Sequence, residues 1–181
     1  AYLGPEYAQS DIEARLAKAG AKFTVLDDEA VITETAQALA DGQAVGWFQG
    51  RMEFGPRALG GRSVLGDARS ATMQKTFNLR VKYRESFRPF APAVLREDVC
   101  HWFDVDADSP YMLMVAEVKE EHRRKMTGDE KALFGIDKLN VPRSDIPAVT
   151  HVDYSARIQT VHRETNPRYH ALISRFKEIS G

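Results

Sequence analysis

The stretch AVGWFQGRMEFGPRALGGRSVL, residues 44–65, holds the two signals on which the fold prediction depends. The apolar run 44–48 follows the turn pair Asp41-Gly42 and predicts a buried strand. Glycines at positions 50, 55, 60 and 61 interrupt the next segment, and residues 63–65 return to a strand-like composition. We therefore expect two strands joined by a glycine-rich loop.

Outward from this loop, helix and strand signals alternate in both directions. Ser10 followed by Glu13 is a capping-box pattern that predicts a first helix, Asp28 predicts the cap of a second, and Asn166-Pro167 begins a last one. Other expected elements are helices at 70–80 and 99–103, and strands at 22–26, 90–95, 111–118, 148–152 and 157–161. Residues 119–145 are expected to form an exposed helical or mobile excursion. The alternation indicates a single α/β (α+β) domain with a twisted mixed sheet flanked by helices.

The charge of the chain is unevenly distributed. The formal net charge is only −1 over 181 residues, yet residues 51–96 carry ten Lys and Arg against three acids. Such a local excess describes an anion-binding pocket or patch better than a generally basic coat for nucleic acid. The hydrophobic content of 43% suits one globular domain with a full core.

Several classes of protein are excluded or disfavoured by composition. Cys100 is the only cysteine, so neither an internal disulfide nor a cysteine zinc site can form, and a reducing cytoplasm fits. No apolar run approaches the roughly 20 residues needed to cross a bilayer. The five histidines lack a metal-ligand spacing, so we expect no metal site built by this chain; they are His101, His122, His151, His162 and His170.

The loop itself has the composition of an oxyanion site. Its glycines allow close approach of the main chain to a ligand, and Arg51, Arg57 and Arg62 supply planar donor forks that match phosphate or carboxylate oxygens. Neither the P-loop ending nor the dinucleotide fingerprint is present. The pattern alone leaves two interpretations open, a phosphate-type site and a plain turn with surface arginines.

A second cationic block follows at residues 81–92. Lys82 and Arg88 flank aromatic residues and precede two prolines that stiffen the backbone, which favours ordered cations. The alternative is that Phe87 and Phe90 belong to the core while the charges face water.

Five segments together resemble one known family. They are GRMEFGPRALG at 50–60, RS at 62–63, FRPFAP at 87–92, PAVTHVD at 147–153 and ARIQTV at 156–161. These segments are similar to the C-terminal, YrdC-like domain of the nodulation-protein and antibiotic O-carbamoyltransferases. The resemblance covers almost the whole chain. It departs from the family at Gly61, where a larger polar residue is usual.

The resemblance also implies a domain organisation. Residues 1–9 would be a connector from a preceding metal-binding domain of the actin-like ATPase type, and residues 10–181 would be the YrdC-like domain. Because family members continue beyond the position of Gly181, we expect this domain to be truncated at its C-terminus.

The implied reaction has two steps. ATP, accompanied by Mg²⁺, and carbamoyl phosphate would form carbamoyl-adenylate in this domain, and the carbamoyl group would then pass to an acceptor hydroxyl in the other one. Matching residue by residue, Arg57, Lys82 and Arg88 would be catalytic. The residues expected around the nucleotide and carbamoyl phosphate are Arg57, Arg62, Ser63, Lys82, Arg88 and Arg157, with Arg51 and Arg84 as second choices; His151 and Asp153 are expected to be structural.

Two functions of other classes remain open from the sequence. An RNA-binding module could use the same basic face, since aromatic residues stand among its cations. A regulatory or docking domain without activity is the other alternative.

Overall fold

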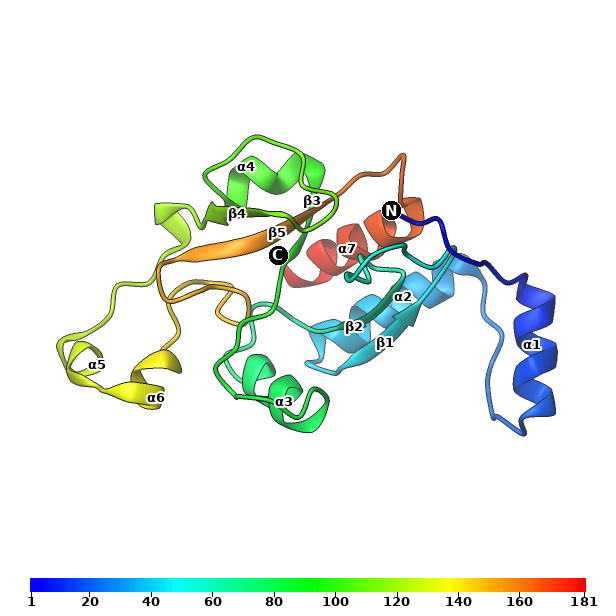
Figure 1. The fold of residues 1–181 in the computed structure, drawn as a ribbon, viewed down its shortest axis with the longest axis horizontal. Coiled ribbons are helices and arrows are strands. Elements are labelled where there is room, and N and C mark those ends of the chain that lie inside the picture. The colour runs from blue at the N-terminus through cyan, green and yellow to red at the C-terminus, as the bar shows by residue number, and fades with distance from the viewer.

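The computed structural model describes all 181 residues and contains seven α-helices, two short 3-10 helices and five strands (Figure 1). In chain order the elements are α1 (Gln9–Lys18), α2 (Asp28–Ala40), β1 (Val45–Phe48), β2 (Arg62–Leu65), α3 (Met73–Arg80), β3 (Ala93–Leu95), η1 (Arg96–Asp98), α4 (Val99–Trp102), β4 (Met114–Glu117), η2 (Glu120–His122), α5 (Gly128–Ala132), α6 (Gly135–Leu139), β5 (Ser155–Val161) and α7 (Pro167–Ser180).

The strands divide between two small sheets. β5 is the centre of a mixed sheet, with β3 parallel on one side and β4 antiparallel on the other. β1 and β2 form a separate antiparallel pair in which Trp47 lies opposite Ser63. The predicted mixed α+β class is therefore confirmed, and the loop 49–61 connects the two strands of the smaller sheet.

Two apolar clusters form the main contacts among the helices and the two sheets. One lies between α4 and the mixed sheet and includes the fully buried Val99, Val118 and Ile158. The other joins α2 to α7, where Ala36 packs with Leu172. Figure 1 shows α2 and α7 side by side, with β1 and β2 next to α2. Burial of such side chains contributes about 1.5–3 kcal/mol each, so these contacts supply the main driving force for folding.

Local signals placed several helices correctly. Pro167 is the first residue of α7, and the Asn166 side chain accepts a hydrogen bond from the Tyr169 amide at 3.4 Å. The Ser70 hydroxyl accepts from the Met73 amide at 3.2 Å and so supports the start of α3. These bonds satisfy amides that have no partner within the helix.

Other local predictions were wrong. Ser10 does not cap α1, because the helix begins at Gln9 and the preceding Ala8 makes no side-chain bond. The cap of α2 is Asp27 rather than Asp28. Residues 22–26 are exposed and form no strand, since no neighbouring strand offers them hydrogen bonds.

Two apolar segments also differ from the expected strands. Residues 148–152 form no strand. Residues 148–150 are buried, the Val149 amide donates to the Ile146 carbonyl at 3.2 Å within a turn, and Val152 is 57% exposed. Within β1 only Trp47 is buried, and Phe48 is 59% exposed. The pairing of β1 with β2 therefore leaves one face of this strand open.

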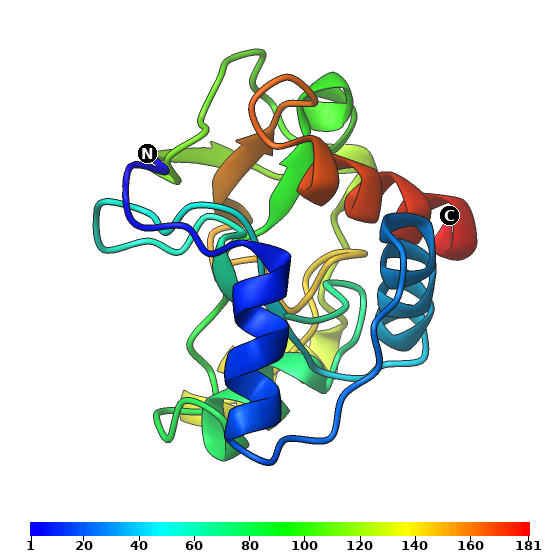
Figure 2. The same ribbon diagram turned by 90° about the vertical axis from the view of Figure 1, so that its right-hand side faces the viewer.

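The segment 119–145 contains α5 and α6, which lie away from both sheets (Figure 1). Their residues are mostly exposed, as the sequence predicted. Helix α1 also buries none of its side chains. It stands at the right-hand edge in Figure 1 and in front of the other elements in Figure 2. None of the helices combines the length and the apolar composition needed to span a bilayer.

Candidate functional site

The loop 49–61 is held by side chains from distant parts of the chain. The Leu59 carbonyl accepts a hydrogen bond from Gln159 Nε2 at 3.0 Å and another from the Tyr2 hydroxyl. Leu59 itself has a φ of 53°, a left-handed conformation that its surroundings must maintain. The loop that carries Arg57 is therefore ordered by tertiary contacts rather than by its own sequence.

The neighbouring Gly60 is required by both conformation and space. Its φ is 84°, and a Cβ at this position would lie 2.5 Å from Cδ1 of Tyr169. Its amide donates to Ser63 Oγ at 3.0 Å, and its carbonyl accepts from Gln49 Nε2 at 3.1 Å. Ser63, expected to contact the ligand, thus uses one lone pair inside the loop, while its hydroxyl hydrogen remains able to donate elsewhere.

The first residues of the chain run beside the same loop. The Gly4 amide donates to the Met52 carbonyl at 2.8 Å, and the Met52 amide donates to the Pro5 carbonyl at 3.0 Å. Arg51 contacts this segment too, lying 3.6 Å from a carboxylate oxygen of Glu6. The charge of Arg51 is therefore partly balanced within the chain.

Arg62 also has an acidic partner. Its guanidinium makes two hydrogen bonds to Glu53, whose side chain is only 4% exposed. This bond raises the pKa of Arg62 and lowers the pKa of Glu53. Arg62, which we predicted to lie near the phosphates, is thus already paired with Glu53. This ion pair joins the loop to the first residue of β2.

Arg57 and Arg157 have no such partner. Arg157 lies on the central strand β5, and Gln159, two residues further along, points to the same side and holds the loop. Burial lowers the pKa of Arg157, and the positive charge of Arg57 lowers it further. Neither side chain makes a hydrogen bond or ion pair, so two like charges lie near each other without an acid to offset them.

The second cationic segment is organised by Asn78 of α3, which is completely buried. Asn78 Nδ2 donates to the Ser86 carbonyl at 3.1 Å and to the Arg88 carbonyl at 2.7 Å. Its Oδ1 accepts from Arg84 Nε at 2.6 Å, and the Arg84 guanidinium lies 5.0 Å from the centre of the Phe90 ring. One buried amide therefore fixes the backbone around residues 84–88.

Lys82 and Arg88 are exposed, and their side chains have no hydrogen-bond or ion-pair partner. Burial lowers the pKa of Arg84, and the charge of Arg88 contributes to this shift. Four of the predicted cations thus form two groups, Arg57 with Arg157 and Arg84 with Arg88, and Lys82 belongs to neither by its charge interactions. No hydrogen bond or ion pair joins one group to the other.

His151 and Asp153 make the contacts expected of structural residues. Asp153 Oδ1 accepts from the Ser155 amide at 3.0 Å and from its hydroxyl at 2.7 Å, and these bonds lower the pKa of Asp153. The same hydroxyl lies 3.1 Å from Nδ1 of His151. The turn before β5 is stabilised in this way.

Sequence reasoning missed the residues that position the cations. Asn78 is a polar residue on the buried side of α3, which it shares with Met73 and Phe77. A polar residue at such a position indicates a buried hydrogen bond, and the sequence offered that signal. The roles of Tyr2 and Gln159 depend on contacts across the whole chain and left no local signal. Two of the histidines judged scattered, His101 and His122, also lie together in space.

The chain is similar to proteins of the family that its sequence segments resemble. Residues 36–181 match the family model described as the carbamoyltransferase C-terminus. An uncharacterized protein of Synechocystis sp. is 58% identical over 182 residues, which cover 99% of this chain and 29% of the relative.

Two other relatives carry functional names. Nodulation protein NolNO of Sinorhizobium fredii is 39% identical over 184 residues, covering 99% of this chain and 24% of the relative. The 3'-hydroxymethylcephem-O-carbamoyltransferase of Streptomyces clavuligerus is 41% identical over 146 residues, covering 81% and 24%. The chain thus spans less than a third of the length of these relatives. The resemblance seen in the sequence is confirmed, and the chain belongs to the carbamoyltransferase C-terminal family.

Proposed function

We propose that this domain binds ATP and carbamoyl phosphate and forms carbamoyl-adenylate within an O-carbamoyltransferase. The observation that supports this proposal is the set of cations without internal partners on ordered segments, Arg57, Lys82, Arg88 and Arg157. Most other arginines of the chain are paired with acids or with backbone carbonyls. Like charges that lie near each other, as Arg57 and Arg157 do, are stabilised when an anion binds between them.

These cations suit the chemistry of adenylate formation. Carbamoyl phosphate must first lose its phosphate group to water, which gives carbamate and inorganic phosphate. A carbamate oxygen then forms a bond to the α-phosphorus of ATP while the bond to pyrophosphate breaks, and both reactants are anions. Guanidinium and ammonium groups lower this repulsion and stabilise charge on the leaving pyrophosphate. Mg²⁺ bound to the nucleotide would neutralise further charge. Positioning and electrostatics then contribute more than a general base.

Arg62 and Ser63 have a supporting part in this proposal. The ion pair of Arg62 with Glu53 fixes the start of β2, and the Ser63 hydroxyl retains a hydrogen for a phosphate oxygen. Transfer of the carbamoyl group to an acceptor hydroxyl would require a second domain, which the longer relatives have room to contain.

Calorimetry with ATP and with carbamoyl phosphate tests the proposal. Each charge-assisted hydrogen bond contributes about 1.5–3 kcal/mol, so removing one cation should weaken binding by roughly tenfold or more. We expect this loss for Lys82→Ala combined with Arg88→Ala, and also for Arg157→Ala. Arg163→Ala removes an exposed arginine from the loop before α7 and is the matched control.

Unchanged binding of both ligands by the Lys82→Ala, Arg88→Ala variant would refute the site. Binding of generic single-stranded RNA that falls steeply with salt and ignores ATP would favour the RNA-binding alternative. If the folded chain binds neither ATP nor RNA, a docking or regulatory domain is the better description.

A further inference from the structure

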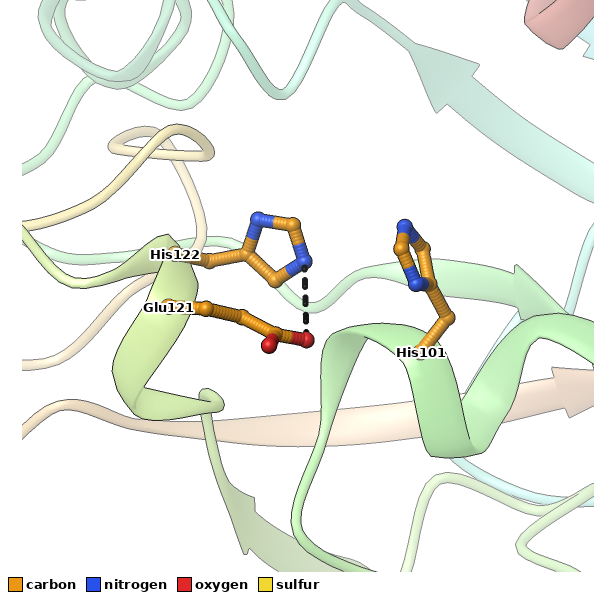
Figure 3. A group of neighbouring side chains, drawn as sticks. All are labelled: His101, Glu121 and His122. Atoms are coloured by element: carbon orange, nitrogen blue, oxygen red, sulfur yellow. Dashed lines mark ion pairs between the residues drawn. The ribbon is translucent and has the colours of Figure 1, made fainter.

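A cluster of three potential metal ligands lies outside the cationic segments. His101 comes from α4, and Glu121 and His122 come from η2 (Figure 3). One ligand atom of each residue lies within 4.8 Å of the other two. Figure 3 shows a ring nitrogen of His101, a carboxylate oxygen of Glu121 and Nε2 of His122 directed toward one another.

The ring of His122 is held in a fixed orientation. Its Nδ1 lies 3.1 Å from Oδ2 of Asp145, and its ring stacks on Trp102 with centroids 4.2 Å apart. A carboxylate at one ring nitrogen keeps the proton there and leaves a lone pair on the other nitrogen. Histidines that bind metals are commonly oriented in this way.

Nε2 of His122 is buried and has no hydrogen-bond partner. Its nearest acidic atom, Oε1 of Glu121, is 4.0 Å away, which is too far for a hydrogen bond. Leaving a buried polar atom without a partner costs free energy, and such atoms are rare unless something binds them. The buried nitrogen is the one that faces Glu121 and His101.

We infer that His101, Glu121 and His122 bind a divalent transition-metal ion of the zinc type, with water in the fourth position. Two imidazoles and one carboxylate are a donor set that Zn²⁺ accepts, whereas Mg²⁺ and Ca²⁺ favour oxygen ligands. Zinc–ligand bonds of roughly 2.0–2.2 Å place tetrahedral donors about 3.3–3.6 Å apart. The cluster must therefore contract slightly.

The exposed members of the cluster can supply that contraction. His101 is exposed and the Glu121 side chain is 61% exposed, so both can change rotamer, while His122 stays fixed between Asp145 and Trp102. The bound ion would join α4 to the beginning of the segment 119–145. It would also satisfy the buried nitrogen of His122.

The thiol of Cys100 is not part of this set. It precedes His101 in the sequence, but it is not among the residues whose ligand atoms lie within 4.8 Å of one another. The inference also does not depend on the proposed carbamoyl chemistry, because none of the ligands belongs to the cationic segments. ATP binding and metal binding can therefore be tested separately on the same chain.

The test is titration of the 181-residue chain with Zn²⁺ by calorimetry and with Co²⁺ by visible absorption near neutral pH. We expect one equivalent to bind, with the intense visible bands of four-coordinate Co²⁺ and without a thiolate charge-transfer band. His101→Ala and Glu121→Gln should each weaken binding at least tenfold. Asp145→Asn keeps all three ligands and should weaken it by about 10–100-fold, because the negative charge that holds the proton on Nδ1 and raises the basicity of Nε2 is lost.

His162→Ala and Cys100→Ala are the controls and should bind both ions as the parent does. His162 lies in the loop before α7, where its Nε2 is 3.8 Å from Oδ1 of Asp108, and it is not one of the three clustered ligands. Zn²⁺ should also raise the melting temperature of the parent and of both controls but not of His101→Ala. Equal affinity of the parent and His101→Ala would overturn the inference, as would loss of binding in Cys100→Ala or failure of the parent to bind either ion.

Discussion

Substitution of Gly60 by alanine separates two physical effects, backbone conformation and close packing, that both act in the loop 49–61. With φ at 84°, any L-residue at this position adopts the left-handed conformation, which costs about 1–2 kcal/mol. The added Cβ would also lie 2.5 Å from Cδ1 and 2.6 Å from Cε1 of Tyr169, and that ring is only 5% exposed. Overpacking of this kind adds about 1–3 kcal/mol.

Gly42 provides the matched control. Its φ is 78°, but no atom lies within 4 Å of the position of its Cβ. Gly42→Ala should therefore lose about 1–2 kcal/mol of stability, and Gly60→Ala about 2–5 kcal/mol. For a domain of this size each kcal/mol lowers the melting temperature by about 2–4 °C.

The assay is urea unfolding of both variants, followed by circular dichroism, together with ATP titration of the folded proteins. Because the Gly60 and Leu59 carbonyls anchor the loop that carries Arg57, Gly60→Ala should also weaken ATP binding, whereas Gly42→Ala should not. Equal destabilisation by the two substitutions would show that the Tyr169 contact contributes nothing, and the reasoning about close packing would then be wrong.

Three further outcomes follow from the same geometry. Asn78→Leu should cost about 2–4 kcal/mol in urea unfolding, because the Ser86 and Arg88 carbonyls lose their buried donor. Arg57→Gln should leave unfolding stability within about 0.5 kcal/mol while weakening ATP binding roughly tenfold, since it removes a charge with no internal partner. Burial raises the pKa of Tyr169 in the folded chain. The free energy of unfolding should therefore hold up to about pH 10 and fall above it, because the Tyr169 phenol ionises there only in the unfolded state. Tyr169→Phe should reduce this fall.

Each of these has a clear contrary result. Asn78→Leu as stable as the parent would mean that water replaces the amide, and unchanged ATP affinity in Arg57→Gln would remove that residue from the site. An alkaline stability profile identical in the parent and in Tyr169→Phe would show that the phenol is not protected from ionisation in the folded chain.

The sequence predicted those parts of the fold that local chemistry determines. The last helix begins at Asn166-Pro167 as expected, because a capping side chain and a proline at the first position act within a few residues. The strand expected at 22–26 failed for the opposite reason, since a strand requires a partner that only the tertiary structure can provide.

In the candidate site, the sequence predicted the cations but not the residues that pair with them or position them. The lack of an acidic partner at Arg57 agrees with the charge excess of residues 51–96, and Arg157 was expected only from the family resemblance. The neutralisation of Arg62 by Glu53 could not be read from the sequence. The histidine cluster was missed because His101 and Glu121 are far apart in the chain and meet only when η2 packs beside α4. Contacts between residues that are distant in the chain produce no pattern in the local sequence, so they could not be predicted from it.

The anchoring of the loop 49–61 has a kinetic consequence. The Leu59 carbonyl accepts hydrogen bonds from Tyr2, which is 57 positions away in the chain, and from Gln159, which is 100 positions away. Gln49 donates to Asn166, which is 117 positions away. Contacts of such sequence separation form late, because each requires closure of a long stretch of chain. Refolding should therefore restore helix content before it restores the ATP affinity that we propose for this domain, and that affinity would report the last stage of folding.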